Sequence, residues 1–199
     1  MSRVPALCSR FPRLLARLYA DTRGIAAVEF AMIMPLLMVM FFGMIDVSMG
    51  VGADRKVTMI AQTMADLASR YTKVVDADFT NFFSIGDAML TPFAPGDLTA
   101  TISQVYIDPT TGTGKVYWSK GDAVRSLNSS VTVPAGLIGK DSSGNVLANQ
   151  YLIFAEVKYA YKPIIGYVVP KAGLTLSETT YARPRQSTCV DYVTAGTCK

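Results

Sequence analysis

One short segment of the chain resembles part of a phosphate-binding loop. Gly112-Thr113-Gly114-Lys115 ends in the Gly-Lys pair that cradles phosphates in such loops. The full pattern also needs a glycine at position 109 and a Ser or Thr after the lysine, and Pro109 and Val116 stand there instead. The segment is therefore expected to be a turn without a phosphate.

Two acidic segments are incomplete as metal sites. Asp46-Val47-Ser48-Met49-Gly50 begins like an Asp-x-Ser-x-Ser metal site but ends in glycine. Asp141-Ser142-Ser143-Gly144 resembles half of a calcium loop and lacks the closing glutamate at the required distance. The sequence therefore predicts no metal site and no cofactor, and it explains these residues as a helix end and a turn.

The chain has 199 residues and no histidine. This excludes a His-based catalytic triad, His-ligated zinc and the usual general base near neutral pH. No other pairing of a nucleophile with a base can be assembled from the sequence. We therefore expect a protein that is not an enzyme and has no small-molecule substrate.

The element that dominates the sequence is an apolar run near the N-terminus. Residues 25–45 are apolar except for Glu29. As a helix they span roughly 31 Å, about the thickness of a bilayer hydrocarbon core. Pro35 lies inside the run and is expected to kink or loosen the helix. The sequence predicts a membrane anchor rather than a buried core helix.

Charge is concentrated ahead of this anchor. Residues 1–24 carry five arginines and one aspartate, and the rest of the chain has fourteen basic and fourteen acidic residues. The net charge of +4 is therefore a property of the leader, and we expect no nucleic-acid-binding face. The arginine excess predicts a cytoplasmic N-terminus, with everything after Ile45 outside.

The expected orientation places the two C-terminal cysteines outside the cytoplasm. Cys189 and Cys198 close the C-terminus, while Cys8 lies in the leader. In an oxidising compartment the C-terminal pair is expected to form a disulfide that ties down the tail. The alternative is two free thiols.

Helical periodicity continues beyond the anchor. Asp46 marks the expected exit from the hydrocarbon, and Gly50 and Gly52 are interpreted as a flexible joint. A stripe of apolar residues at spacings of three and four then runs to about Arg70. It either packs on the chain's own domain or pairs with a partner helix, and it consists of Val57, Ile60, Met64, Leu67 and Tyr71.

The rest of the chain is typical of strands and turns. A short helix is expected from Asp78 to Leu90, followed by alternating or β-branched segments separated by Gly, Pro, Asp and Ser clusters. The expected strands are 99–107, 115–118, 151–161 and 174–182, with a hairpin tip at 141–145. Four Tyr residues are interpreted as exposed, cross-strand aromatics: Tyr151, Tyr159, Tyr161 and Tyr167.

The expected fold class is α+β. A transmembrane helix continues as an amphipathic helix and is followed by a small antiparallel β-sheet domain. The expected parts are a basic cytoplasmic leader (1–24), a transmembrane helix (25–46), a helix extension (47–72) and a β-rich periplasmic domain (73–199).

The leader does not fit an ordinary secretory signal. The apolar run is too long, and no small-x-small cleavage site with a polar start follows it. Gly24, ahead of the run, offers another site. A peptidase at the cytoplasmic face would remove the arginine-rich leader there and leave the anchor in place.

At this site the chain resembles a known family. Gly24, four small or aliphatic residues and then Glu29-Phe30 resemble the prepilin processing motif. With Pro35-Leu36-Leu37 and Phe42–Asp46, the string is similar to the TadE-like proteins of tight-adherence (Flp) pilus systems. Weaker similarity returns at two segments, Tyr159–Pro163 and Ala182–Arg185.

The resemblance implies a pilin-like fold and a pseudopilin or minor pilin role in pilus assembly. It implies cleavage by a prepilin peptidase between Gly24 and Ile25. It also implies contacts with inner-membrane lipid, other pilins or pseudopilins and the assembly platform. The matching glutamate of pilins is thought to pair with the freed N-terminal amine, here that of Ile25. The alternative is that Glu29 lies near the interface and reaches water.

Two functions therefore remain open. The first is a pseudopilin-like structural or assembly component of a tight-adherence pilus. It would be anchored in the bacterial inner membrane and have a periplasmic domain. The sequence leaves open whether the protein enters the filament or stays at its base. The second is an uncleaved, membrane-tethered periplasmic module for binding or adhesion.

Overall fold

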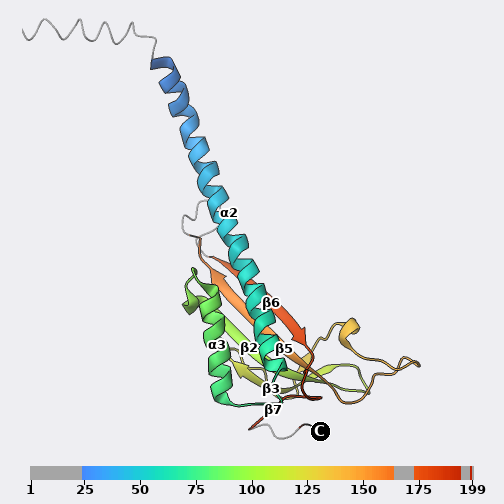
Figure 1. Ribbon diagram of the computed structural model, residues 1–199. Coiled ribbons are helices and arrows are strands. Elements are labelled where there is room, and N and C mark those ends of the chain that lie inside the picture. Colours follow the sequence, from blue (N-terminus) through green and yellow to red (C-terminus); the bar gives the residue numbers. More distant parts are fainter. Residues whose placement is uncertain (1–23, 164–172, 194–197, 199) are drawn as a thin grey trace, which may run out of the picture. The chain divides into compact units, whose positions relative to one another are not determined.

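A computed structural model describes residues 24–163, 173–193 and 198 of the chain (Figure 1). It consists of two compact units that divide between Ile45 and Asp46. The structure confirms the expected α+β class: a long apolar N-terminal helix precedes a five-stranded antiparallel sheet.

The first element is a single helix, α2 (Ile25–Ser69). The run of aliphatic, Met, Phe and Ala residues favours helix throughout, and Pro35 is accommodated inside it. Gly50 and Gly52 were expected to form a joint, but the helix continues through both. Two glycines lower helix propensity by about 1 kcal/mol each, which packing of the segment from Asp46 onward outweighs.

The sheet has the order β4-β3-β2-β5-β6, and every neighbouring pair is antiparallel. The long central pair, β2 with β5, is in unbroken register from Leu98↔Tyr159 to Ile107↔Gln150. Strand β6 forms one edge. The strands are β2 (Leu98–Ile107), β3 (Gly114–Gly121), β4 (Ser130–Val131), β5 (Gln150–Tyr161) and β6 (Leu174–Ala182).

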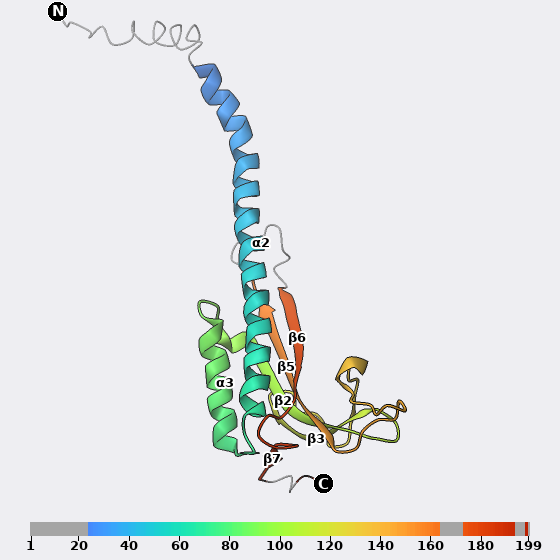
Figure 2. The ribbon, with the colours of Figure 1, turned by 45° about the vertical axis from the view of Figure 1, so that its right-hand side comes forward.

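The segment of α2 from Asp46 onward and helix α3 (Asp76–Leu90) lie side by side against one face of the sheet (Figures 1 and 2). Gly86 lets the two helices approach closely, because a Cβ there would overlap the end of the Met64 side chain. The main core between helices and sheet includes Val57, Ile60, Phe79, Phe82, Ile102, Trp118, Ile153 and Val157.

A second, smaller apolar cluster lies on the face of the sheet opposite the helices, because its β5 members Leu152 and Phe154 alternate with Ile153 and Ala155 of the main core. It combines β2, β3 and β5 side chains with Val131 of β4 and the loop residue Val133. The loop after β4 contains a 3₁₀ turn, η3 (Ala135–Leu137), and an isolated bridge, Lys140↔Val146, that forms the expected hairpin tip. A further 3₁₀ turn, η2 (Pro95–Asp97), leads into β2.

The C-terminal segment closes the domain. Strand β7 (Asp191–Tyr192) pairs in parallel with β1 (Lys73–Val74), which lies between the two helices in sequence. Beside this ladder, the indole Nε1–H of Trp118 donates to the carbonyl of Val190 at 2.8 Å, and the Val190 N–H donates to Oε1 of Gln104 at 2.7 Å.

Three of the tyrosines expected to be exposed are buried. Tyr151, Tyr159 and Tyr161 each retain 5% or less of their exposure. They lie on the helix-bearing face of β5, where Phe93 contacts the rings of Tyr159 and Tyr161. Tyr167 lies outside the described residues.

Candidate functional site

The residues of the expected processing site lie where α2 begins. Gly24 immediately precedes the helix, with open space around it. Ile25 and Phe30 are 57% and 58% exposed, and Glu29 is exposed as well. Ile25 and Glu29 are four residues apart in one helix, so their side chains lie on the same face, about 5–6 Å apart at Cβ.

The apolar part of α2 has its side chains exposed. Every large apolar side chain from Ile25 to Phe42 is exposed in the structure. Helix α2 is long and apolar enough to cross a membrane. Continuous apolar surface of this extent is typical of a lipid or protein contact and not of a surface facing water. The N-terminal part of α2 could therefore be a membrane anchor.

Asp46 begins the second unit and is unusual there. Its side chain is 1% exposed, and neither carboxylate oxygen has a hydrogen-bond partner among the described residues. The nearby Tyr161 hydroxyl donates to the Asp46 backbone carbonyl at 3.4 Å. Burial, and then the Asp46 charge, raises the pKa of Tyr161. The carboxylate is left without the partner that a buried charge needs.

The apolar stripe packs within its own domain. Val57, Ile60 and Met64 are at most 1% exposed in the core between α2, α3 and the sheet. Leu67 is partly buried against the same core. Tyr71, just past the helix, packs its ring edge-on against Phe82 at 5.4 Å. Val57, Ile60, Met64 and Leu67 thus pack on the chain's own domain, whereas Tyr71 remains 38% exposed.

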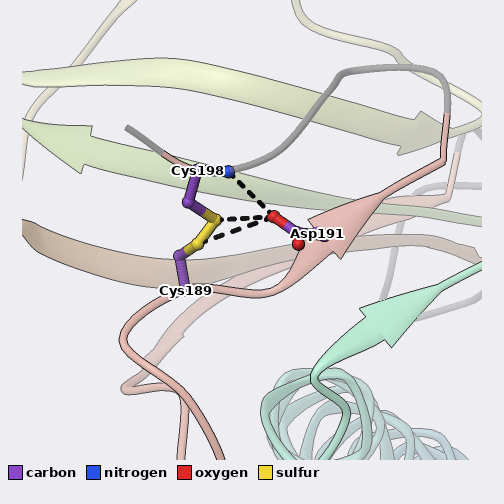
Figure 3. Close-up of side chains that lie close together, drawn as sticks. All are labelled: Cys189, Asp191 and Cys198. Carbon is purple, nitrogen blue, oxygen red and sulfur yellow. Dashed lines mark hydrogen bonds between the residues drawn. A yellow bond between two sulfur atoms is a disulfide. The ribbon is translucent and has the colours of Figure 1, made fainter.

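Cys189 and Cys198 are joined by a disulfide (Figure 3). Oδ1 of Asp191 accepts the backbone N–H of Cys198 at 2.9 Å and points at the two sulfur atoms. The three side chains bring their possible ligand atoms within 4.8 Å of one another. In the disulfide neither sulfur is a thiolate, so this arrangement ties the tail to β7 and does not offer a set of metal ligands.

The two turns that resembled binding loops use their own acidic groups internally. Asp108 accepts from the Lys115 ammonium at 2.8 Å and from the Thr110 N–H, and these bonds lower its pKa. Asp141 accepts the N–H groups of Asn145 and Ser143, which lowers its pKa. Both carboxylates thus serve to stabilise turns.

Two polar arrangements gave no signal in the sequence. Arg125 forms a bidentate ion pair with Glu156, at 2.5 and 2.7 Å, and its guanidinium lies 5.4 Å from the centre of the Phe154 ring. The Glu156 carboxylate raises the pKa of Arg125. Gln104 is fully buried and bonds to the C-terminal segment. Both pairings join residues far apart in the chain, and local spacing says nothing about such contacts.

Comparison with known families gives one match. Residues 24–66 match the family described as TadE-like protein, and this segment contains Gly24, Glu29 and the whole apolar run. No curated protein matches the chain, and no solved structure matches it.

Proposed function

We propose that the chain is a pseudopilin-like structural component of a tight-adherence (Flp) pilus, because residues 24–66 match the TadE-like family. The observation that carries this proposal is the continuous apolar helix that begins at the Gly24–Ile25 bond and has Glu29 one turn inside. The chain works by contacts and not by catalysis.

A prepilin peptidase cuts after Gly24. Three features support this: the site lies immediately before α2, it is exposed, and a Cβ at Gly24 would meet no other atom. Packing therefore does not require a glycine at this position, and recognition by the peptidase would account for it. After cleavage the new amine of Ile25 lies on the same helix face as Glu29 and can pair with its carboxylate.

The apolar helix holds the mature protein in the inner membrane, with residues 46–199 in the periplasm. The arginine-rich leader supports this orientation. The disulfide between Cys189 and Cys198 agrees with an oxidising compartment. The exposed apolar surface of α2 contacts lipid first and then other pilins or the assembly platform.

N-terminal sequencing of the membrane-extracted protein tests the cleavage. Ile25 is the expected first residue. Gly24→Ala should give an unshifted, longer band, and Glu29→Val should reduce processing or pilus assembly. Gly52→Ala and Glu178→Val are matched controls, because they change a glycine and a glutamate far from the site. Normal processing and normal pili in both test variants would overturn the proposal.

A second candidate is a membrane-tethered binding module that keeps its leader. A cleft on the sheet lined by tyrosines favours it. Met1 or Ser2 as the first residue of the purified protein would support this candidate over the first.

A further inference from the structure

A cleft of about 390 Å³ lies at the end of the sheet where β2, β3 and β5 meet. Its volume is within the range of small-molecule sites in proteins. Three tyrosines from three neighbouring strands line it. The lining residues are Tyr106, Lys115, Val116, Tyr117, Asn128 and Tyr151.

A β-bulge brings the third tyrosine into this cluster. The register of β2 with β3 moves from Gln104↔Trp118 to Val105↔Val116, so Tyr117 is the extra residue. Val116 packs in the second apolar cluster, while the Tyr117 ring meets that of Tyr151 at 5.9 Å between centres. Bulges interrupt the ladder, increase strand bending and often re-aim a side chain next to a binding site. Here the bulge completes an aromatic surface.

The other two tyrosines of the cleft also contact each other. The rings of Tyr106 and Tyr151, which are directly paired across β2 and β5, lie 5.2 Å apart between centres and are tilted.

The polar residues of the cleft carry no unbalanced charge. Asn128 is exposed, with a positive φ of 60° and its N–H bonded to the Val116 carbonyl. The Lys115 ammonium is neutralised by Asp108 at 2.8 Å.

We propose that this cleft binds a neutral saccharide. The faces of tyrosine rings pack against the C–H groups of a pyranose, while the Tyr106 hydroxyl and the Asn128 amide exchange hydrogen bonds with sugar hydroxyls. A charged ligand fits less well, because the lysine at the cleft already has its counter-ion. The proposal concerns residues 106–151 and holds whether or not the leader is cleaved.

Saturation-transfer NMR and calorimetry on the full chain test the proposal. The protein is kept in a detergent without a sugar headgroup and titrated with cellohexaose, chitohexaose and maltohexaose. We expect at least one to bind and its ring protons to receive saturation from tyrosines. Tyr106→Ala and Tyr117→Ala should each weaken binding about tenfold. Tyr71→Ala is the matched control and should leave the affinity unchanged, because Tyr71 contacts Phe82 and does not line the cleft.

A second variant separates binding from folding. Asn128→Gly keeps the left-handed backbone, which glycine adopts readily, and removes only the amide at the cleft. It should weaken saccharide binding while the thermal midpoint changes little. The proposal is overturned if none of the three oligosaccharides binds, if binding survives both tyrosine variants, or if a proline-rich peptide binds at these tyrosines and the sugars do not.

Discussion

At the residue scale, three carboxylates with hydrogen-bond partners contrast with the buried carboxylate of Asp46, which has none among the described residues. Asp76, Asp108 and Asp141 each accept two or more hydrogen bonds from neighbouring groups. Asp46 is more deeply buried than any of them and has no such bonds among the described residues. Folding therefore gains from the first group and is opposed by Asp46.

The Asp46→Asn variant is expected to be more stable than the parent chain. An amide of the same shape removes the cost of burying an unpaired charge, and we expect a gain of about 1–3 kcal/mol in the free energy of unfolding. Thermal unfolding of the detergent-solubilised protein, followed by near-ultraviolet circular dichroism, measures it. Asp54→Asn on the exposed side of α2 should have little effect. A clear loss of stability in Asp46→Asn would mean that the carboxylate is paired.

The partnered carboxylates predict a loss of stability in acid. Hydrogen bonds lower the pKa of three aspartates. The largest contribution comes from the Lys120 side chain at Asp76, from the Lys115 side chain at Asp108 and from the backbone N–H of Asn145 at Asp141. When folding lowers the pKa of a carboxyl group, the ionised group stabilises the folded protein. This contribution is fully present at pH values above the ordinary pKa of 3.8, and it is lost as the pH falls through the lower pKa of the folded state. Thermal midpoints measured from neutral pH to below 3.8 should therefore fall.

The Asp141→Asn variant should show a shallower acid dependence, because one titrating group is gone. Ser142→Ala, in the same turn, should keep the parent profile. Identical profiles for the parent chain and Asp141→Asn would contradict the role given to this carboxylate.

At the element scale, the sequence predicted what depends on local pattern. The apolar run predicted the helix, and β-branched alternation predicted Leu174–Ala182 with the bounds that β6 has. The hydrophobic spacing of the stripe in α2 identified core residues, but periodicity alone does not say which surface they pack on. Strands β1 and β7 were missed, because a two-residue parallel pair between Lys73 and Tyr192 leaves no periodic pattern.

Two glycines in helices should respond oppositely to substitution. Gly52 has open space around its Cβ position, so Gly52→Ala should add about 0.5–1 kcal/mol through helix propensity. Gly86 faces Met64 and Ile60, so Gly86→Val should push α3 from α2 and cost about 1–3 kcal/mol. Denaturant unfolding of both variants measures the differences. A stable Gly86→Val variant would contradict the close approach of the two helices.

At the scale of the whole molecule, the chain combines an apolar helix with a domain that has its own core. The apolar side chains from Ile25 to Phe42 are exposed, whereas those beyond Asp46 form a buried core, and exposed apolar surface of this extent is typical of contact with lipid or other helices. The sequence predicted this division from composition. The tyrosine-lined cleft needed the structure, since the bulge at Tyr117 depends on pairing between strands.

Lysines in the apolar run should release the protein from the membrane. Each lysine near the middle of a membrane helix costs about 2.5–3.5 kcal/mol, so Leu36→Lys combined with Leu37→Lys opposes insertion by roughly twice that amount. Alkaline extraction of membranes should move this variant to the soluble fraction. Gln62→Lys, on an exposed position of α2, should stay with the membranes as the parent chain does. Retention of the double variant would exclude this helix as the anchor.

The pairing of β1 with β7 has a consequence for biosynthesis. Lys73 emerges from the ribosome more than a hundred residues before Asp191, its ladder partner. Until those last residues arrive, the Trp118 indole lacks the Val190 carbonyl and the Gln104 side chain lacks the Val190 amide. The core of the nascent chain therefore stays incomplete until the end of synthesis. Premature termination by a dozen codons should give a truncated protein that quality-control proteases degrade.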